Sequence, residues 1–268
     1  MSEIEKIREL GSRLSFYLRP KTFPLAIKFV KSGESIPEKA YRPSARFVFC
    51  RIMLLSRRTG RSYVIGKENI PCLGVVMLGL ANYSKDVWEE SKKMLIKDFL
   101  VGWRFYKSEE IAEKVINIVE EDSLPPGSFT DVIVSPIERT IIKPDIVVVY
   151  GDGAQINRLV SGVAYADEET PFIEAKLTSL AGCRALSKCY KTRKAQFILP
   201  GYGERYQGFT GDDEVAVVFH IEALPKIVEG LEYTFRGGLR YPTPYMVEYS
   251  SPAPEPEEKA IKKLLGES

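Results

Sequence analysis

Histidine is nearly absent from this chain of 268 residues, which contains a single one. Sites that bind a metal through several histidines, and most proton relays built on imidazole, are therefore excluded. The side-chain amides are also scarce, with three Gln and four Asn beside many Glu, Lys and Arg. This bias is typical of proteins from thermophiles, and it indicates such an origin.

An excess of charge of one sign is also missing. Lys and Arg number 38 and Asp and Glu number 36, which leaves a net charge of +2. Proteins dedicated to nucleic acid carry a concentrated basic surface, because they must contact many phosphates. We therefore expect no nucleic-acid partner.

The chain has no long hydrophobic run. Its longest apolar stretch, residues 70–81, is interrupted by Pro71 and by glycines, and it is much shorter than the roughly 20 residues that span a bilayer. Residues 1–9 are charged and lack the apolar segment of a secretory signal. These observations predict a cytoplasmic protein with no membrane partner, in which the four cysteines are more often thiols or ligands than disulfides.

Several catalytic signatures are missing as well. The sequence has no GxSxG elbow, Walker A loop, HExxH helix or CxxC pair. The single histidine, His220, stands inside the apolar run VAVVFHI, where a structural role is more common than a catalytic one. The residues alone therefore leave open whether the protein is an enzyme.

Short apolar runs alternate with segments of helical periodicity. We expect strands at residues 24–30, 62–65, 131–134, 145–150, 171–175, 197–199 and 215–221. We expect helices at 4–18, 44–58, 73–80, 86–99, 109–121, 153–165, 179–190 and 222–233. This alternation predicts an α+β fold with a mixed β-sheet flanked by helices.

The expected organisation is one domain over residues 1–249, with a sub-boundary at LPPGSF, residues 124–129. A strand, a helix, a further strand and Cys72 follow one another in the first half, and a similar series ends at Cys183 in the second. Two weakly similar halves are therefore one reading of the fold. Residues 250–268 form a Pro- and Glu-rich linker and a short helix, and we expect this tail to be disordered.

A glycine-rich segment, PGYGERYQGFTGDDE, lies between two predicted strands. It is longer than a hairpin turn, and long ordered loops are often functional. Its glycines would let backbone N–H groups approach an anion, Arg205 could clamp a carboxylate or phosphate, and the aromatic rings could stack on a planar ligand. The predicted binding residues are Gly201, Gly203, Arg205, Tyr206, Gly208 and Gly211. The alternative is a mobile surface loop.

The cysteines offer a second candidate site. Cys72 and Cys183 each stand near the start of a predicted helix, and Arg184 follows Cys183, so both positions favour the thiolate that binds metals. Cys50 lies on a helix whose other apolar residues face the core, whereas Cys189 points about 120° away from Cys183. We predict that Cys50, Cys72 and Cys183 converge near the glycine-rich loop, with Arg205 facing the same cavity. The alternative is that the cysteines pack as small hydrophobic residues or form a disulfide.

Several segments together resemble the ArCR-type family of domains of unknown function, DUF169. They are PLAIKF, RFVFC, NIPCLGVVMLGL, PDIVVVYGDGAQINRLV, AGCRAL, LPGYGERYQGFTGDDEVAV, IVEGLE and LRYP, and they span residues 24–242. The resemblance implies that Cys50, Cys72 and Cys183 fall where the family also has cysteine, whereas Cys189 does not. It implies an anaerobic or thermophilic source, and it brings no established activity.

Two functions follow from these observations. In the first, Cys50, Cys72 and Cys183 hold an iron–sulfur cluster or another metal, and the glycine-rich loop positions a substrate beside it. In the second, the protein binds an anionic or nucleotide-like small molecule without metal or catalysis. Both predict a small-molecule partner. Convergence of the three sulfurs distinguishes them, because cluster ligands must share one centre.

Overall fold

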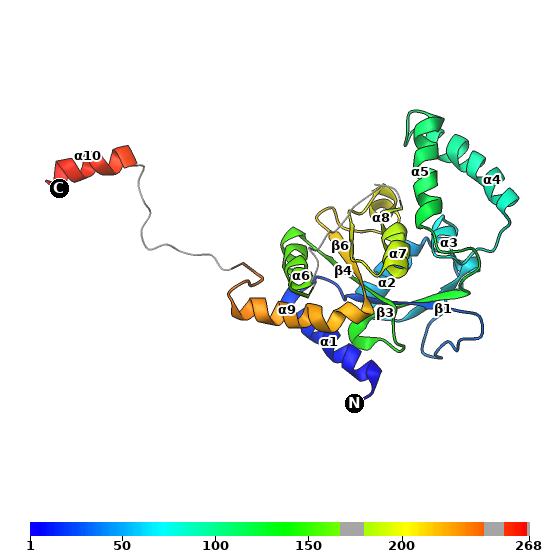
Figure 1. Ribbon diagram of the computed structural model, residues 1–268, viewed down its shortest axis with the longest axis horizontal. Coiled ribbons are helices and arrows are strands. Elements are labelled where there is room, and N and C mark those ends of the chain that lie inside the picture. Colours follow the sequence, from blue (N-terminus) through cyan, green and yellow to red (C-terminus); the bar gives the residue numbers. More distant parts are fainter. Residues whose placement is uncertain (167–179, 244–254, 267–268) are drawn as a thin grey trace.

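A computed structural model describes residues 1–166, 180–243 and 255–266 (Figure 1). The strand expected at residues 171–175 lies outside the described residues. The six strands of the described residues form one sheet with the order β2-β3-β1-β4-β6-β5, in which every neighbouring pair is antiparallel. The strands are β1 (Leu25–Val30), β2 (Tyr63–Gly66), β3 (Asp131–Pro136), β4 (Ile146–Gly151), β5 (Gln196–Ile198) and β6 (Val215–His220).

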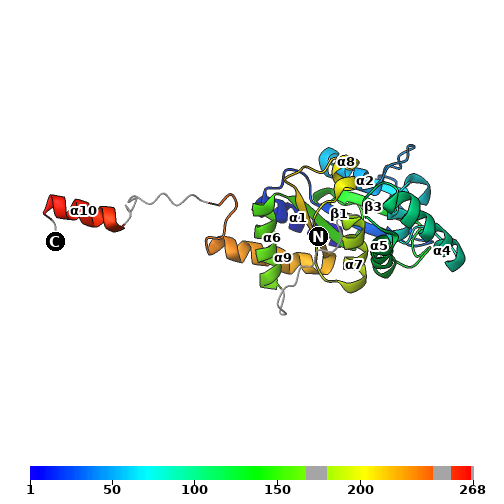
Figure 2. The same cartoon turned by 90° about the horizontal axis from the view of Figure 1, so that it is seen from above.

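Helices cover both faces of the sheet (Figures 1 and 2). One face packs against α2 (Phe49–Thr59) and α7 (Ala181–Thr192), and the other against α1 (Glu3–Leu18), α6 (Gly153–Ala166) and α9 (Leu224–Arg236). Because both faces are covered, β3 and β4 are buried along their whole length, which explains their almost continuous apolar sequence. The fold class is α+β, as the sequence predicts, although the six strands of the described residues are antiparallel rather than mixed.

A helical arm extends from the body of the molecule on the side away from α9 (Figures 1 and 2). It comprises α4 (Lys85–Met94), the π-helix η2 (Leu95–Val101) and α5 (Glu109–Asp122). The arm has a small apolar cluster of its own, centred on Trp88, Leu100 and Ile116. The short helix α3 (Gly74–Met77) connects β2 and its following turn to this arm.

The strand order is symmetric about the central pair β1–β4. In both halves the first residue of the inner strand pairs with the last residue of the next strand: Leu25 with Pro136, and Ile146 with His220. The central pair obeys the same two-fold relation, since Leu25 lies opposite Val148 and Ile146 opposite Ile27. One-turn helices η3 (Ile137–Arg139) and η4 (Ile221–Ala223) follow β3 and β6 at once. The strands of the sheet are therefore related by a pseudo-two-fold axis.

The structure pairs the cysteines of the two halves differently from the sequence-based prediction. The series noted in the sequence sets Cys72 against Cys183. In the structure, Cys183 lies on α7, which precedes the edge strand β5, whereas Cys72 follows the edge strand β2. The series led to the wrong pairing because a helix, α6, is present only in the second half. The position that corresponds to Cys183 is Cys50 on α2.

Some boundaries also differ from the predicted ones. The helix predicted from residue 44 begins at Phe49, and the glycine-rich loop contains a short helix, α8 (Tyr202–Tyr206). The break at residues 124–129 joins α5 to β3, and the strands on both sides of it belong to one sheet. The tail contains a helix, α10 (Glu255–Leu265), none of whose residues is buried.

Candidate functional site

Three of the four cysteines line one small cavity of about 90 Å³, called here the cysteine cavity. Its walls come from the start of α2, the turn before α3, the start of α7, and α8. The lining residues are Val48, Phe49, Cys50, Met53, Cys72, Leu180, Gly182, Cys183, Gly201, Gly203, Glu204 and Gln207. The structure thus brings Cys50, Cys72 and Cys183 together beside the glycine-rich loop.

Cys50 and Cys183 reach the cavity from the first turns of α2 and α7. The two helices pack on the same face of the sheet and contribute to the same apolar cluster. Cys72 reaches it from the turn between β2 and α3, where its carbonyl oxygen accepts the N–H of Val75 at 3.0 Å. A bond from the N–H of Phe47 to the carbonyl oxygen of Asn69, at 2.9 Å, holds this turn against the start of α2.

Two glycines leave room for the sulfurs. A Cβ atom on Gly74 would lie 3.3 Å from Sγ of both Cys72 and Cys183. These two sulfur atoms are therefore separated by no more than twice that distance. A Cβ atom on Gly208 would lie 3.1 Å from Sγ of Cys50, so larger side chains at either position would crowd the thiols.

Cys189 is placed elsewhere. It is fully buried in the apolar cluster beneath α7 and does not line the cysteine cavity. Burial raises the pKa of its thiol to about 12. Its role is that of a small hydrophobic side chain.

Burial raises the pKa of two of the cavity thiols, those of Cys50 and Cys183. Burial raises the pKa of Cys50 to about 12, and the negative charge of Glu204 adds to the effect. Burial likewise raises the pKa of Cys183 well above its usual value. The expectation that Arg184 helps to make Cys183 a thiolate is wrong, because the Arg184 side chain donates through Nε to Asp122 at 2.5 Å.

Glu204 is a residue of the cysteine cavity that the sequence did not reveal. Its side chain is buried and lines the cysteine cavity. The carboxylate accepts the N–H of Gly182 at 3.2 Å, the N–H of Gly201 at 3.4 Å and the hydroxyl of Tyr150 at 3.4 Å. Burial nevertheless raises its pKa. The one signal in the sequence is its position three residues after Gly201, which suits an acid that binds the N–H groups at a helix start.

The predicted loop residues separate into two groups. Gly201 and Gly203 line the cysteine cavity, and Gly208 packs on Cys50. The other three residues face elsewhere: Arg205, Tyr206 and Gly211. The Arg205 guanidinium donates to the carbonyl oxygens of Gly211 and, at 3.4 Å, of Glu214. It closes the loop on itself and does not line the cavity, contrary to our expectation. Tyr206 is exposed and stacks on Tyr202.

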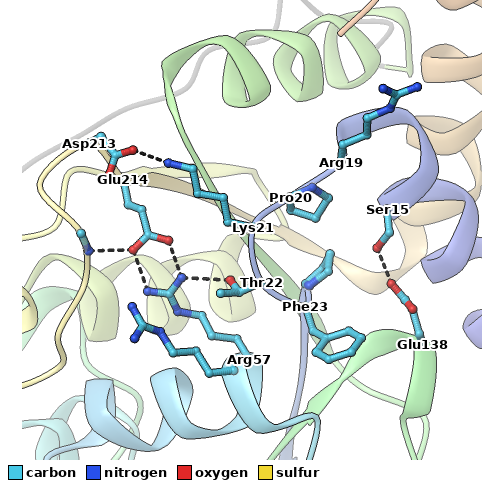
Figure 3. A pocket seen from close by; sticks show the side chains of 13 residues that line it. Ser15, Arg19, Pro20, Lys21, Thr22, Phe23, Arg57, Glu138, Asp213 and Glu214 are labelled. Carbon is cyan, nitrogen blue, oxygen red and sulfur yellow. Dashed lines mark hydrogen bonds and ion pairs between the residues drawn. The ribbon is translucent and has the colours of Figure 1, made fainter. Parts of the chain in front are cut away.

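A second, larger pocket of about 630 Å³ is lined by Gly211 and by residues from α1, α2 and the segment that follows α1. Figure 3 shows Arg57 on its wall, bound by Glu214 through both carboxylate oxygens, at 2.5 and 2.9 Å, and bonded to the hydroxyl of Thr22 at 3.0 Å. Lys21 forms an ion pair with Asp213 across the same pocket at 2.5 Å. We refer to it as the basic pocket, because Arg19 and Arg58 also line it.

None of the helices in the described residues is long and apolar enough to cross a membrane. The sequence profile of DUF169, described as uncharacterised ArCR, matches residues 13–230. An uncharacterised protein of Methanocaldococcus jannaschii is 25% identical over 238 residues, which cover 86% of this chain and 96% of that protein. No solved structure matches the chain.

Proposed function

The chain belongs to DUF169, the family of uncharacterised ArCR proteins, and on the basis of the cysteine cavity we propose that it binds an iron–sulfur cluster through Cys50, Cys72 and Cys183. The observation that carries this proposal is the meeting of three thiols from three separate elements around one cavity. Cysteines that merely fill a core have no reason to share a cavity wall, and Cys189 illustrates that behaviour.

The proposed centre is a cluster and not a single ion. Among the described residues, no group of three or more His, Cys, Asp or Glu side chains is close enough to hold one metal ion. Sulfurs on a single zinc ion approach one another to roughly 4 Å, because each Zn–S bond is about 2.3 Å. In a cluster each cysteine binds a different iron, so the sulfurs can lie farther apart.

Binding of a cluster would deprotonate the buried thiols. A buried thiolate without a cation is unfavourable, which is why burial raises the pKa of Cys50 and Cys183. A metal centre supplies the missing positive charge and deprotonates the thiols that bind it. Three cysteines on a cubane cluster would also leave one iron without a protein thiolate, and that iron could take a ligand from outside the chain.

The proposal is tested by anaerobic reconstitution with iron and sulfide, followed by metal and sulfide analysis and an absorbance spectrum. We expect bound iron with sulfide-to-iron charge-transfer absorption in the wild-type protein. Cys72→Ser should lose the cluster and keep its fold, whereas the matched variant Cys189→Ser should retain the cluster. Wild-type protein without iron, or a Cys72→Ser variant with undiminished iron, would refute the proposal.

The basic pocket favours a second candidate, the binding of an anionic small molecule. Its volume of about 630 Å³ lies within the range of about 300–1,000 Å³ that is usual for ligand sites. Within the part of the chain that the structure describes, neither Arg19 nor Arg58 forms an ion pair, so both guanidinium groups remain available to a carboxylate or phosphate. Isothermal titration with citrate and with pyrophosphate tests this candidate. Binding should weaken at least tenfold in Arg58→Ala and remain unchanged in Arg46→Ala, whose exposed side chain lies outside the pocket lining.

A further inference from the structure

A third pocket, of about 550 Å³, lies beside the C-terminal end of α7 and is called here the tyrosine pocket. Its volume is within the range of about 300–1,000 Å³ that is usual for ligand sites. Among the described residues, it shares no lining residue with the cysteine cavity or the basic pocket. Its polar lining comes from the ends of β1, α7 and β6 and from the residue before β4, and it includes Lys31, Asp145, Tyr190, Lys191, Arg193 and His220.

The pseudo-two-fold axis of the sheet relates this pocket to the basic pocket. The edge strands β2 and β5 have the same register, since Tyr63 lies opposite the fourth residue of β3 and Gln196 opposite the fourth residue of β6. Counted back from these strands, positions on α2 and α7 correspond in pairs: Arg57 and Tyr190, Arg58 and Lys191, and Cys50 and Cys183. The first two pairs line the basic pocket and the tyrosine pocket respectively.

Arg193 has a backbone conformation that suits glycine. It caps α7 in the left-handed region with φ of 58°, and its N–H donates to the carbonyl oxygen of Cys189 at 2.8 Å. Gly60 caps α2 in the same way, with φ of 72° and an N–H that donates to the carbonyl oxygen of Ser56 at 3.0 Å. Glycine adopts this conformation readily, whereas for arginine it is strained. An arginine kept at such a position indicates a function for its side chain.

Two further positions carry a polar side chain in the second half alone. His220 ends β6 and corresponds to Pro136, which ends β3. Asp145 precedes β4 and corresponds to Pro24, which precedes β1. The carbonyl oxygen of Pro24 accepts the N–H of the residue after β3 at 2.8 Å, and that of Asp145 accepts the N–H of the residue after β6 at 2.9 Å. Because proline supports the same backbone contact, the fold does not require the polar side chains.

The carboxylates that neutralise the basic pocket have no acidic counterparts in the tyrosine pocket. Asp213 and Glu214 stand before β6, and the same positions before β3 hold Phe129 and Thr130. Phe129 lines the tyrosine pocket, with its ring centre 5.5 Å from that of Tyr190. The tyrosine pocket therefore has an aromatic wall where the basic pocket has acids.

The charge that remains in the tyrosine pocket is positive. The carboxylate of Asp145 is already bound, since it accepts the N–H of Phe29 at 2.7 Å and pairs with Nζ of Lys28 at 3.2 Å. Lys31 has no carboxylate partner within the part of the chain that the structure describes. Lys191 donates to two carbonyl oxygens at the end of α5, at 2.6 and 3.3 Å, so its charge is not neutralised by an acid.

Three more donors in the pocket are available to a ligand. The hydroxyl of Tyr190 forms no hydrogen bond within the described residues. Nδ1 of His220 accepts the N–H of Glu222 at 3.3 Å, so the neutral ring carries its proton on Nε2. Burial lowers the pKa of His220 and favours this neutral ring. Arg193 pairs with Glu222 at 2.6 Å, but both side chains are exposed, and such pairs contribute little.

We propose that the tyrosine pocket binds a phosphate group, for which Lys31 and Arg193 supply the positive charge. The Tyr190 hydroxyl and the Nε2–H of His220 complete a set of donors from four separate segments. Phosphate oxygens accept from several directions, whereas the two oxygens of a carboxylate lie in one plane, so this set favours phosphate. The site is independent of the proposed cluster and of the basic pocket.

The single histidine reports directly on this site. In an untagged chain with ¹³C-labelled histidine, His220 gives the one imidazole Cε1–H signal. Inorganic phosphate should shift this signal saturably at constant pH, and sodium chloride at equal ionic strength should not. The titration uses Arg58→Ala, so that binding in the basic pocket does not compete. No saturable shift, or an equal shift with chloride, would overturn the proposal.

Replacement of the strained arginine tests its side chain. Arg193→Gly, added to Arg58→Ala, should bind phosphate at least tenfold more weakly and should unfold at a higher temperature, because glycine fits this backbone. The matched control is Arg104→Gly in the same background, since Arg104 is exposed, has φ of 61° and lines none of the three pockets. Equal affinities of the two chains for phosphate would overturn the proposal.

A second variant decides the matter if Arg193→Gly unfolds at a lower temperature. Tyr190→Phe removes the hydroxyl and keeps the ring that packs on Phe29 and Phe129. In the Arg58→Ala background it should weaken phosphate binding at least threefold and leave the midpoint of thermal unfolding unchanged. An unchanged affinity would contradict the placement of the phosphate.

Phenyl phosphate distinguishes the two sources of a phosphate group. Isothermal titration of Arg58→Ala should show saturable binding of inorganic phosphate and of phenyl phosphate. Binding of phenyl phosphate that is at least threefold tighter supports an esterified ligand whose body lies on Phe129, and equal or weaker binding supports free phosphate. Failure of both to bind Arg58→Ala, while wild-type protein binds pyrophosphate, would overturn this site and leave the basic pocket as the anion site.

Discussion

Arg57 lies over the ring of Tyr150, with its Cζ atom 4.3 Å from the ring centre. Arg57 lines the basic pocket, and the hydroxyl of Tyr150 donates to Glu204, which lines the cysteine cavity. A single buried set of polar side chains thus separates the two candidate sites. On one side this set supplies Arg57 to the wall of the basic pocket, and on the other side it supplies Glu204 to the wall of the cysteine cavity.

The ion pair of Arg57 with Glu214 should matter strongly for stability. The Arg57 side chain is 1% exposed and that of Glu214 is 8% exposed. Arg57→Ala would leave the Glu214 carboxylate buried without its partner, which typically costs about 3–5 kcal/mol. Denaturant unfolding followed by circular dichroism measures the loss.

The neighbouring residue supplies the control for this prediction. Arg58 is exposed and forms no ion pair in the described part of the chain, so Arg58→Ala should change the free energy of unfolding by less than about 0.5 kcal/mol. Equal losses of unfolding free energy in the two variants would show that the buried ion pair stabilises the protein no more than the exposed Arg58 does.

Glu204 should make stability depend on pH in metal-free protein. Burial raises its pKa above the ordinary value of 4.5. A group whose pKa is raised by folding stabilises the folded state below its unfolded pKa, and this contribution is lost as pH rises through the folded pKa. The free energy of unfolding of Glu204→Gln relative to wild type should therefore increase from pH 4 towards neutrality. Exposed Glu229→Gln should show no such slope, and a slope of opposite sign for Glu204→Gln would contradict the prediction.

The thiol of Cys50 should resist alkylation in the metal-free folded protein. Its pKa of about 12, compared with an ordinary value of 9.0, lowers the thiolate fraction at pH 8.5 by roughly three orders of magnitude, and only the thiolate reacts with iodoacetamide. Time-resolved mass spectrometry should show Cys50 reacting at least a hundredfold more slowly than in urea-unfolded protein. A rate within tenfold of the unfolded rate would show that the thiol is not desolvated.

Local periodicity allowed much of the fold to be predicted from the sequence. The apolar spacing of α1 fits a helix, and the short apolar run of β4, rich in β-branched residues, fits a buried strand. The two-fold relation was only partly visible, because it depends on strand register and not on residue identity. The correspondence of Cys50 with Cys183 appears only when β2 and β5 are placed at opposite edges of one sheet.

The part of the candidate site that the sequence predicts consists of side chains at helix starts, whose orientation follows from the helix. The sequence does not predict side chains whose hydrogen-bond partners are backbone groups. Cys50 and Cys183 begin helices that pack on one face, so their meeting could be argued from the sequence. Arg205 was expected to bind an anion, but it binds carbonyl oxygens within its own loop, and these partners leave no trace in the sequence. Glu204 was missed because a glutamate in a glycine-rich segment is usually exposed.

The C-terminal helix should contribute little to stability. Every residue of α10 is exposed, and it has no buried side chain. Deletion of residues 255–268 should therefore shift the midpoint of thermal unfolding by less than about 2 °C. Differential scanning calorimetry measures the shift, and a decrease of more than about 4 °C would show that the helix docks on the body of the protein.

A side chain at position 208 should destabilise the protein, because it would crowd its neighbours and not because it would impair anion binding. A Cβ atom there would lie 2.5 Å from the carbonyl oxygen of Glu204 and 3.0 Å from Cβ of Cys50. Because these neighbours include backbone, α8 or α2 must move, and such overpacking typically costs about 1–3 kcal/mol. Gly203→Ala is the matched control, since its Cβ atom would meet nothing within 4 Å. Chemical denaturation of the metal-free proteins should show Gly208→Ala less stable than wild type and Gly203→Ala within about 0.5 kcal/mol of it. If Gly208 instead serves only to bring backbone N–H groups to an anion, Gly208→Ala should unfold as the wild type does in the absence of ligand.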